Sequence, residues 1–503
     1  WNSLTLPPHN LSRLHLTPHP DPAVDSSFLL GSAAQCAIGL AGLSAAYLHE
    51  LRTGVGQDVC VDVRHGVLEF KSEAYYTIDD QLPPGDLFDP LAGTYKTADD
   101  NWVRIHTNFP HHRAALLSIL SLPPSASTSK TAVASALLQW PSFTFEEEAA
   151  RRGMVATALR TFEQWDAEEQ GRALSGVGPV EVRRVGDAPR REVEVGKGGR
   201  PLDGVRVLDL TRVLAGPVCG RTLAAHGADV LHLTSPHLPA LPLLDTLTST
   251  GKRTSQLDLT SPSLASLVAD ADVFLQAYRP GGLEEKGFGV GDVVRMRGGR
   301  GVVCAGLRAY GWEGGWRDRR GFDSLVQTAM GFNHAEAQAY AAFRGSGETD
   351  TDAELVPRAL PMQALDHAAG YLLAFGINAA LCKTITEGGS WEVRVSLAAV
   401  GNWIRSLGRL TPQLAFGSGA PHLPPRVAPQ DEEVAALAVS VYESPSDDED
   451  DEAVPGRRRR RRRMRRMSVL RHAALLGSTP VREGEAPMRL DANAPRWLPQ
   501  LRS

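Results

Sequence analysis

The chain has 503 residues, of which 42% are hydrophobic and 22% charged, and its formal net charge is −5. These proportions are those of a soluble globular protein, and the length suits about two to four domains or one large interwoven unit. The small net charge gives no reason to expect nucleic acid or a membrane as a partner. We also expect no apolar run to reach the ~18 residues that cross a bilayer.

Five cysteines lie far apart in the chain, and none belongs to a C-x-x-C pattern. This spacing favours buried thiols in a reducing compartment, with a cytoplasmic location as the default, over disulfides or a zinc site. His106, His111 and His112 have no acid or cysteine at ligand spacing. We therefore expect no metal there and assign these histidines to the surface or to a domain interface.

The N-terminal part of the chain predicts a helix and then a strand. Residues 1–25 are rich in Pro and His and suggest a loosely ordered lead-in. From Ser26 the sequence is small and apolar, and it closes with Arg52 and Gly54 as a helix end should. The alternation of Val59–Val63 then predicts a strand.

Further helices and strands are predicted between this strand and a linker. His65–Tyr76 reads as a helix, and residues 90–120 read as strand, Asp-Asp turn, strand and helix. Acidic helices are expected around Phe145–Arg152 and Thr161–Gln170. Residues 191–200 form a charged, Gly-rich linker.

A βαβ unit follows the linker. The apolar, β-branched runs Val205–Leu210 and Ala228–Leu233 flank Gly216–His226, which has helix composition and opens with Gly-Pro. Strand, loop, helix and strand over about 30 residues predict two parallel neighbours in one sheet.

A long helix is predicted at Leu365–Leu381, with the sequence LDHAAGYLLAFGINAAL. We interpret it as amphipathic, with a single acid, Asp366, at its beginning. The polar segment Gln338–Leu360 is expected to be a loop before it, and Trp391–Leu397 a strand after it.

This helix and strand repeat an earlier part of the chain. A shift of 334 residues lays Ala34–Val61 over a second copy and pairs Gly42 with Gly376. At the same shift Asp366 falls on Ser32, so the first copy lacks the acid. The alternative, that two Ala/Gly-rich helices align through composition alone, stays open.

The composition changes beyond Thr411. Residues 411–467 form a low-complexity linker that contains the acidic block Asp447–Glu452 and the arginine block Arg457–Arg463. Such charge blocks favour a solvated linker, although an arginine block also suits a nuclear-localisation or RNA-contact patch. Residues 468–503 regain ordinary composition and are expected to be a tail.

Several segments together resemble the class III CoA-transferases, the CaiB/BaiF family. The likeness is strong over about Arg200–Leu410 and weaker over Ser26–Pro189. It is carried by PLDGVRVLDLTRVLAGP from Pro201, Ala271-Asp-Val-Phe, Tyr278-Arg-Pro-Gly, Gly287-Phe, Ala309-Tyr-Gly, Gly321-Phe-Asp with Gln327, and the helix that begins with Asp366.

The resemblance implies an α/β fold with a Rossmann-like parallel-sheet domain and a smaller α+β domain. Residues 26–190 resemble the second half of the family with its small domain, and 201–410 resemble the CoA-binding and catalytic half. The halves therefore stand in permuted or tandem order. Family members form interlocked dimers, which implies a homodimer, whereas one chain that supplies both halves would equally be a monomer.

The resemblance also implies that coenzyme A is a substrate and that no cofactor is permanently bound. CoA carries several phosphates, so its site needs fixed cations. By resemblance, Arg212, Val213 and Leu214 contact CoA, and the further candidates are Lys252, Arg253, Arg279, Lys286, Arg308 and Tyr310.

Asp366 is the expected catalytic residue. The resemblance implies that Asp366 is a nucleophile. It would exchange CoA between an acyl-CoA and a carboxylic acid through a mixed anhydride and an aspartyl-CoA thioester. Backbone N–H groups at the helix start would stabilise the oxyanion. The alternative is a structural role, because the helix dipole also favours an acid in the first turn of a helix.

Two other functions compete with the transferase. Racemases and epimerases of 2-methylacyl-CoA share the fold but use a second acid/base, a His within Gly-His-Asp. Here that motif reads Gly321-Phe322-Asp323, and phenylalanine carries no proton. The third candidate is a non-catalytic CoA-binding protein, suggested by Ser32 in the first copy and by the charged C-terminal blocks.

Overall fold

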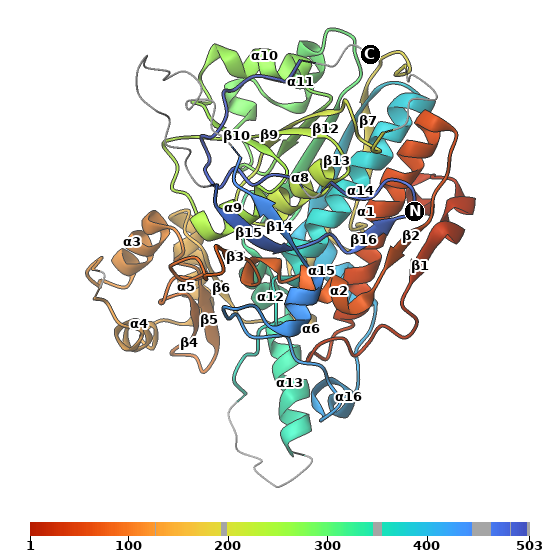
Figure 1. Cartoon of the computed structure of the whole chain (residues 1–503). Helices are drawn as coiled ribbons and strands as arrows, with labels where there is room; N and C mark the ends of the chain where they lie inside the picture. Colours follow the sequence, from red (N-terminus) through yellow and green to blue (C-terminus); the bar gives the residue numbers. More distant parts are fainter. Residues whose placement is uncertain (126, 193–198, 346–354, 445–463, 483, 500–503) are drawn as a thin grey trace, which may run out of the picture.

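The protein is described by a computed structural model of residues 1–503, except for 126, 193–198, 346–354, 445–463, 483 and 500–503. Its largest element is a seven-stranded sheet with the strand order β10-β9-β8-β11-β12-β13-β7 (Figure 1). The strands are β7 (Glu181–Gly186), β8 (Arg206–Leu210), β9 (Asp229–Thr234), β10 (Arg253–Gln256), β11 (Val273–Gln276), β12 (Val303–Arg308) and β13 (Ser390–Ser396).

The chain winds this sheet outward from β8 in both directions. It passes from β8 through β9 to β10, then returns beside β8 as β11 and continues through β12 to β13. These neighbours are all parallel, and the edge strand β7 is antiparallel to β13. In doubly wound sheets of this order, ligands bind at the carboxyl ends of the strands where the winding reverses, here β8 and β11. The predicted βαβ unit is confirmed, with α8 (Ala215–Ala225) between β8 and β9.

Alternating side chains of the sheet divide the interior into two cores. Val273 and Leu275 point into the core that contains α8 and α14 (Ala364–Thr386), whereas Phe274 points into the core under α10 (Pro262–Asp270) and α11 (Val290–Met296). The other helices of this part are α9 (Pro242–Thr248), η4 (Glu284–Lys286), α12 (Asp323–Met330), α13 (Phe332–Gly345) and α15 (Leu397–Ser406).

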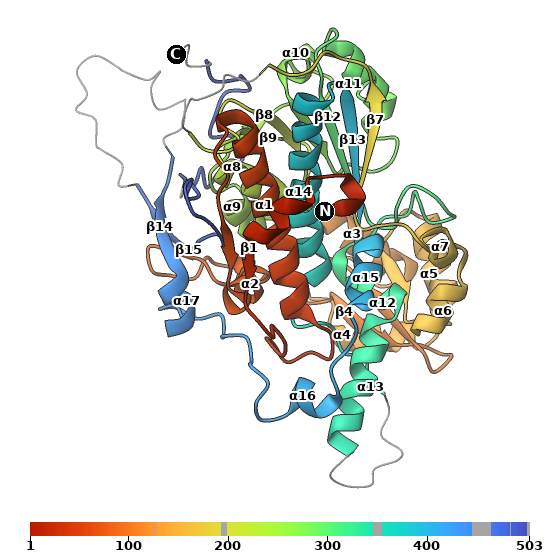
Figure 2. The same ribbon diagram turned by 90° about the vertical axis from the view of Figure 1, so that its right-hand side faces the viewer.

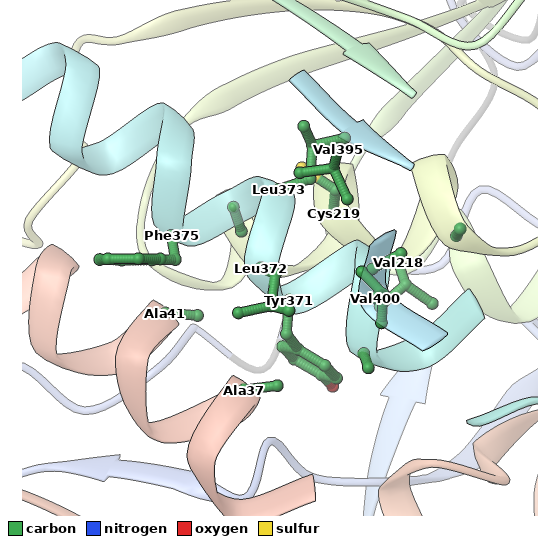
Figure 3. Close-up of a cluster of buried hydrophobic side chains, with 14 of the residues drawn as sticks. Ala37, Ala41, Val218, Cys219, Tyr371, Leu372, Leu373, Phe375, Val395 and Val400 are labelled. Carbon is green, nitrogen blue, oxygen red and sulfur yellow. The ribbon is translucent and has the colours of Figure 1, made fainter. Parts of the chain in front are cut away.

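Helix α14 lies at the centre of the molecule, and the prediction that it is amphipathic is wrong. Every residue from Ala364 to Thr384 is buried. Neighbouring elements surround the helix, and a helix covered on all sides is apolar all round. Figure 3 shows side chains of four such neighbours around it: Ala37 and Ala41 of α1, Val218 and Cys219 of α8, Val395 of β13 and Val400 of α15.

Two helices, α1 (Leu30–Thr53) and α14, are long and apolar enough to cross a membrane by length and composition. This corrects the expectation that no such segment exists. In the structure 78% of the apolar window of α1 and 89% of that of α14 are buried. Protein therefore covers their apolar surfaces, as in core helices.

Two structural repeats pack side by side through these helices (Figure 2). The N-terminal repeat consists of α1, β2 (Val59–Val61) and α2 (Val63–Glu69), and the C-terminal repeat consists of α14, β13 and α15. Gly54 and Gly388, paired by the shift of 334 residues, have φ angles of 77° and 75° where the two helices end. Asp62 and Ser396, paired in the same way, cap α2 and α15 with their side chains.

Internal contacts of the repeats match as well as their elements do. A Cβ on Gly42 would lie 2.9 Å from Cγ1 of Val59, and a Cβ on Gly376 would lie 2.5 Å from Cγ1 of Val393. Both pairs place a helix against its own following strand, at positions related by the same shift. The repeat is therefore structural and not an effect of Ala/Gly composition.

The repeats meet each other at equivalent residues. The Asn378 side-chain amide donates to Oγ of Ser44 at 3.2 Å and to the carbonyl of Ala41 at 3.3 Å, and Ser44 is the partner of Asn378 at the shift of 334. The strands flanking each repeat also agree. β2 has a parallel neighbour, β1 (Leu14–Leu16), and an antiparallel one, β16 (Ala474–Leu476), as β13 has β12 and β7.

A small lobe, residues 93–158, follows the N-terminal repeat. The predicted strand, turn, strand and helix are confirmed, with Asp100 at φ 56° in the turn. The lobe and the helices after it comprise β4 (Gly93–Lys96), β5 (Trp102–Ile105), α3 (Pro110–Ile119), α4 (Lys130–Leu137), α5 (Ser142–Arg151), β6 (Ala156–Ala158), α6 (Phe162–Ala167) and α7 (Glu169–Ala173).

Residues 1–25 are packed rather than loose. Leu4, Leu6 and Val24 are buried, and the Trp1 ring stacks on Phe375 of α14 with the ring centroids 6.1 Å apart. This segment contains η1 (Asn2–Leu4), η2 (Pro8–Arg13) and β1.

Other expected loops also contain regular structure. The segment Gln338–Leu360 begins inside α13, and the described part of residues 411–467 contains two helices, one strand and the start of another. The acidic block and Arg457–Arg463 lie outside the described residues, whereas Arg465 pairs with Glu443 at 2.7 Å. The elements of this part are α16 (Pro412–Phe416), α17 (Glu432–Leu437), β14 (Ala438–Tyr442) and β15 (Arg466–Leu470), which also pairs with β3 (Thr77–Ile78) after η3 (Ser72–Ala74).

Residues 489–493 run along the outer edge of the main sheet. The Asn493 N–H donates to the carbonyl of Thr254 in β10 at 2.8 Å, and the Thr254 N–H donates to Oδ1 of Asn493 at 3.0 Å. The Thr254 hydroxyl donates to the carbonyl of Arg489 at 2.6 Å. The tail thus occupies hydrogen-bonding groups of the edge strand β10.

Candidate functional site

Asp366 lies in the first turn of α14, and another acid holds the start of that helix. Oδ2 of Asp323 accepts the backbone N–H groups of Leu365 and Asp366 at 2.8 and 2.9 Å. Oδ1 of Asp323 also accepts from the side-chain amide of Gln327. Because Asp323 fills the capping role, the Asp366 carboxylate is not needed to cap the helix.

The Asp366 carboxylate is buried, and no described residue donates a hydrogen bond to it. The residue is 8% exposed. Burial, and then the charges of Asp323 and Glu73, raise its pKa well above the ordinary value of an aspartate. A buried acid that faces two other acids without a donor is costly to the fold, and such groups are typical of reaction centres.

Asp323 is buried beside Asp366. Burial raises the pKa of Asp323 to about 6, against the opposing effect of the hydrogen bonds that it accepts. Those bonds use the N–H groups of Leu365 and Asp366, so these two groups are not free donors. This corrects the expectation that backbone N–H groups at the start of α14 form an oxyanion hole.

The residue after Asp366 contacts the segment that follows the N-terminal repeat. Nε2 of His367 lies 2.9 Å from Oε2 of Glu73 in η3, and the two side chains are 1% and 5% exposed. The Phe70 ring stacks on the His367 ring with centroids 5.6 Å apart and on Tyr371 at 6.0 Å. Residues from before the linker and after it therefore build the same site.

The loop after β8 has a strained backbone. Val213 adopts a φ of 75°, which is rare for a β-branched residue and costs about 1–3 kcal/mol. Arg212 packs its guanidinium 5.2 Å from the Phe109 ring centroid of the small lobe. Arg212 and Val213 line a pocket at the carboxyl end of β8, together with Ser235 after β9. This is the end of the sheet where the winding reverses.

A second cavity, of about 430 Å³, lies between the small lobe and the main body. Thr157 of β6 lines one side and Tyr310 with Trp316 line another. Three arginines also line it: Arg279, Arg319 and Arg320.

These arginines have no acidic partner within 4 Å among the described residues, and neither has Arg212. Burial and the charge of Arg279 lower the pKa of Arg320 to about 10, and burial and the charge of Arg212 lower that of Arg279. The acid Asp318 also lines the cavity, but it pairs with Arg317 at 3.4 Å. Arginines that repel one another and have no ion-pair partner are suited to an anion with several charges.

The three histidines of the small lobe lie at the interface with this arginine group. The His106 ring stacks on Phe322 with centroids 3.8 Å apart, and Nε2 of His112 lies 3.2 Å from Nη1 of Arg320. Burial lowers the pKa values of His106 and His112 to about 3. In the part of the chain that the structure describes, no three His, Cys, Asp or Glu residues gather as a metal site would require.

Two predicted CoA contacts are instead structural ion pairs. The Lys252 ammonium is fully buried, 2.8 Å from Oδ2 of Asp209, and it also donates to the carbonyl of Pro217. Arg253 forms a bidentate pair with Asp229, in which Nε donates to Oδ1 at 3.0 Å and Nη2 donates to Oδ2 at 3.1 Å. Both residues stand at the amino end of β10, opposite the carboxyl ends where ligands bind, which is why the prediction fails for them.

The other predicted contacts have different environments. Leu214 is 3% exposed, and its side chain belongs to the core. Lys286 is exposed after β11, and Arg308, at the end of β12, packs over Trp312 and lies 3.8 Å from Glu284. Tyr310 is buried and lines the cavity between the lobes.

Sequence reasoning missed four residues of the site. Asp323 was visible as the third residue of Gly-Phe-Asp, but the motif gave it no role. Arg319 and Arg320 stand directly before that motif, so a basic pair next to it was the available signal. Glu73 had no signal, because only the packing of η3 against α14 brings it to His367.

The comparisons with known proteins agree with this geometry. Residues 202–442 match the family described as CoA-transferase family III. This matched part, here called the family III region, is a little under half of the chain. It holds Asp366, Asp323 and all the arginines of the site, and it corresponds to the main sheet from β8 onward with α14 and α15.

Relatives of this family III region are named as transferases. An acyl-CoA transferase of Gibberella moniliformis is 28% identical over 400 residues, which are 72% of this chain and 68% of the relative. Acetyl-coenzyme A transferase nodX of Hypoxylon pulicicidum is 31% identical over 50% of this chain and 43% of its own length. The crystal structure of Rv3272 from Mycobacterium tuberculosis is 32% identical in sequence. The match covers 42% of this chain and 57% of that chain, with a TM-score of 0.35.

The first of these alignments reaches beyond the family III region. A match over 72% of the chain must include residues outside 202–442. The G. moniliformis relative therefore shares part of the flanking sequence in the same order. The chain spans about half the length of the other two relatives.

Proposed function

We propose that this chain transfers CoA from an acyl-CoA to a carboxylic acid, with Asp366 as the nucleophile. One observation carries the proposal: Asp366 is a buried acid at a helix start that another acid, Asp323, already caps. An acid placed there only for the helix would use those N–H groups itself. Its raised pKa makes the ionised carboxylate a stronger nucleophile.

The exchange balances without any other reactant. An Asp366 oxygen attacks the thioester carbonyl carbon, the C–S bond breaks, and CoA leaves as the thiolate from a mixed anhydride. The thiolate then attacks the Asp366 side-chain carbonyl, which releases the first carboxylate and leaves an aspartyl-CoA thioester. An incoming carboxylate attacks this thioester, and the expelled thiolate takes the new acyl group and restores Asp366. Each intermediate is an activated acyl group, so one difficult transfer becomes several easier ones.

The arginines without acidic partners support binding of CoA as the substrate. Arg212 and Arg279 follow β8 and β11, at the carboxyl ends where the winding reverses. Arg320 stands three residues before Asp323, which ties the cation group to the start of α14. We assign the phosphates of CoA to these arginines and the thioester to Asp366.

Mass spectrometry after incubation with short-chain acyl-CoAs and hydroxylamine trapping tests the proposal. Attack of hydroxylamine on the acylated Asp366 should leave a modified peptide that contains this residue. Asp366→Asn should give none, while Ser32→Ala, the matched change in the N-terminal repeat, should give as much as the wild type. An unmodified Asp366 in protein that demonstrably binds CoA would refute the nucleophile.

Experiments on the same proteins distinguish the transferase from the two alternative functions, a racemase and a CoA-binding protein. Exchange of the α-proton of a 2-methylacyl-CoA in deuterated water, without an acid acceptor, would indicate a racemase. The structure offers such a reaction no second proton donor at Phe322, since its neighbour His106 is held neutral by burial. Binding of CoA without either reaction would indicate a binding protein.

A further inference from the structure

We propose that Glu73 of η3, the segment that follows the N-terminal repeat, is a positioning residue for Asp366 and acts through His367. This rests on the proposed nucleophile. The pair is direct, with Nε2 of His367 2.9 Å from Oε2 of Glu73. Because His367 follows Asp366 in the first turn of α14, the bond fixes the turn that carries the nucleophile.

The pair exists at only one of the two equivalent places. At the shift of 334 residues, His367 corresponds to Ala33 and Glu73 corresponds to Leu407. Ala33 is fully buried in the main core, and Leu407 packs against the same core. The helix start that carries Ser32 thus has apolar residues where the helix start that carries Asp366 has an acid and an imidazole. If the pair served only to hold the protein together, we would expect it at both helix starts. It occurs only at the helix start that carries the acid.

The surroundings indicate which form of the imidazole is present. Nδ1 of His367 is buried and has no hydrogen-bond partner among the described residues. A charged imidazole would leave an N–H donor unsatisfied there, whereas a neutral one leaves only a lone pair. We therefore assign a neutral His367 that donates its Nε2 proton to an ionised Glu73. Phe70, stacked on the ring, holds this orientation.

With a neutral imidazole between them, the charge of Glu73 acts on Asp366. The charged and titratable groups that face this site are Asp323 from α12, Glu73 from η3, Arg104 of β5 toward Asp323, and Lys71 toward Glu73. Asp323 and Glu73 both raise the pKa of Asp366. Glu73 therefore sets the position of the first turn and makes the nucleophile more basic.

The test replaces Glu73 with glutamine, whose side-chain oxygen can still accept the Nε2 proton of His367. In Glu73→Gln the acidic limb of the pH profile of kcat/KM should move down by about one pH unit, because a negative charge near Asp366 is gone. Titration of Asp366 followed by carbon NMR of labelled aspartate, assigned with Asp366→Asn, should show the same shift. Glu73→Ala should in addition reduce kcat, since the first turn loses its anchor.

The control is Asp166→Asn, which removes an exposed ion pair with Arg405 on the C-terminal repeat and should leave both titrations unchanged. Unaltered titration of Asp366 in a folded Glu73→Gln protein would overturn the inference. The NMR readout does not require turnover, so the positioning role stands or falls separately from the transferase activity. A wild-type protein without activity but with the shift in Glu73→Gln would refute only the proposed function.

Discussion

The two structural repeats have one architecture and two chemistries. Each begins with a long buried helix whose first N–H groups are taken by an acid from outside the helix. Asp21 accepts the N–H groups of Gly31 and Ser32 at 2.8 and 2.9 Å, as Asp323 does for α14. The requirement of the fold, an acceptor for the helix start, is therefore met in both repeats.

The difference lies in what the third helical residue does. The Ser32 hydroxyl donates to Asp21 at 2.7 Å, so the N-terminal start is a closed, satisfied set of hydrogen bonds. Asp366 at the equivalent place brings a second acid against Asp323 and has no donor. The comparison separates the residues that cap the two helix starts from Asp366, whose carboxylate takes no part in capping.

The largest expected contrast is in activity. Asp366→Asn should reduce kcat by about 10³-fold or more, since it removes the proposed nucleophile, whereas Ser32→Ala should change kcat less than twofold. Steady-state transfer of CoA from an acyl-CoA to a carboxylic acid, assayed with matched protein concentrations, measures both. Equal losses in the two variants would show that the helix start, and not the acid, matters.

The same pair should differ in the pH dependence of stability. The pKa of Asp366 is raised by folding, so the unfolded chain loses its proton first and wild-type stability falls as pH rises from about 4. Asp366→Asn removes this titrating carboxyl group. Its free energy of unfolding, relative to that of the wild type, should therefore increase with pH, by about 1.4 kcal/mol for each unit by which folding raises the pKa of Asp366. Urea unfolding between pH 4 and 8 measures the gain.

Ser32→Ala provides the baseline for that measurement. Its difference from wild type should be the same at every pH, because no titrating group is removed. A gain for Asp366→Asn that did not grow with pH would mean that the carboxylate is not held in its protonated form by the fold.

Removal of the capping acids should affect the repeats alike in stability and unlike in function. Asp21→Ala and Asp323→Ala should each lower the free energy of unfolding by about 1–2 kcal/mol, because two N–H groups lose their acceptor. Only Asp323→Ala should also reduce transfer. Chemical denaturation together with the transferase assay tests this, and an inactive but stable Asp21→Ala protein would contradict the division of roles.

The smallest contrast concerns the two glycines that face their strands. Gly376→Ala places a Cβ closer to its valine than Gly42→Ala does, 2.5 against 2.9 Å. We expect a loss of about 2 kcal/mol for the former and about 1 kcal/mol for the latter. Thermal unfolding of the two variants ranks them, and the reverse order would show that the N-terminal repeat is the more tightly packed.

Much of the fold could be predicted because it depends on local patterns. The strands around α8, the turn at Asp100 and the helix end at Gly54 all follow from apolar spacing and glycine. The surroundings of α14 could not be predicted in this way, since its apolar residues reveal burial but not on how many sides. Only the tertiary packing shows that all of its faces are covered.

The site was predicted in part for the same reason. Asp366 stood out as a lone acid at the start of an apolar helix. Lys252 and Arg253 misled because a basic pair beside a strand does not reveal which end of the strand it occupies. Glu73 and His367 are 294 residues apart, and no local pattern joins them.

The hydrogen bonds between the tail and β10 have a consequence for the behaviour of the protein at high concentration. An unpaired edge strand presents a row of N–H and C=O groups on which a neighbouring molecule can add a strand and begin to aggregate. Asn493 occupies both backbone groups of Thr254 within the same chain, and the carbonyl of Arg489 accepts the Thr254 hydroxyl. Residues 489–493 thus protect this edge from self-association. A chain shortened before Arg489 should lose solubility before it loses the fold around Asp366.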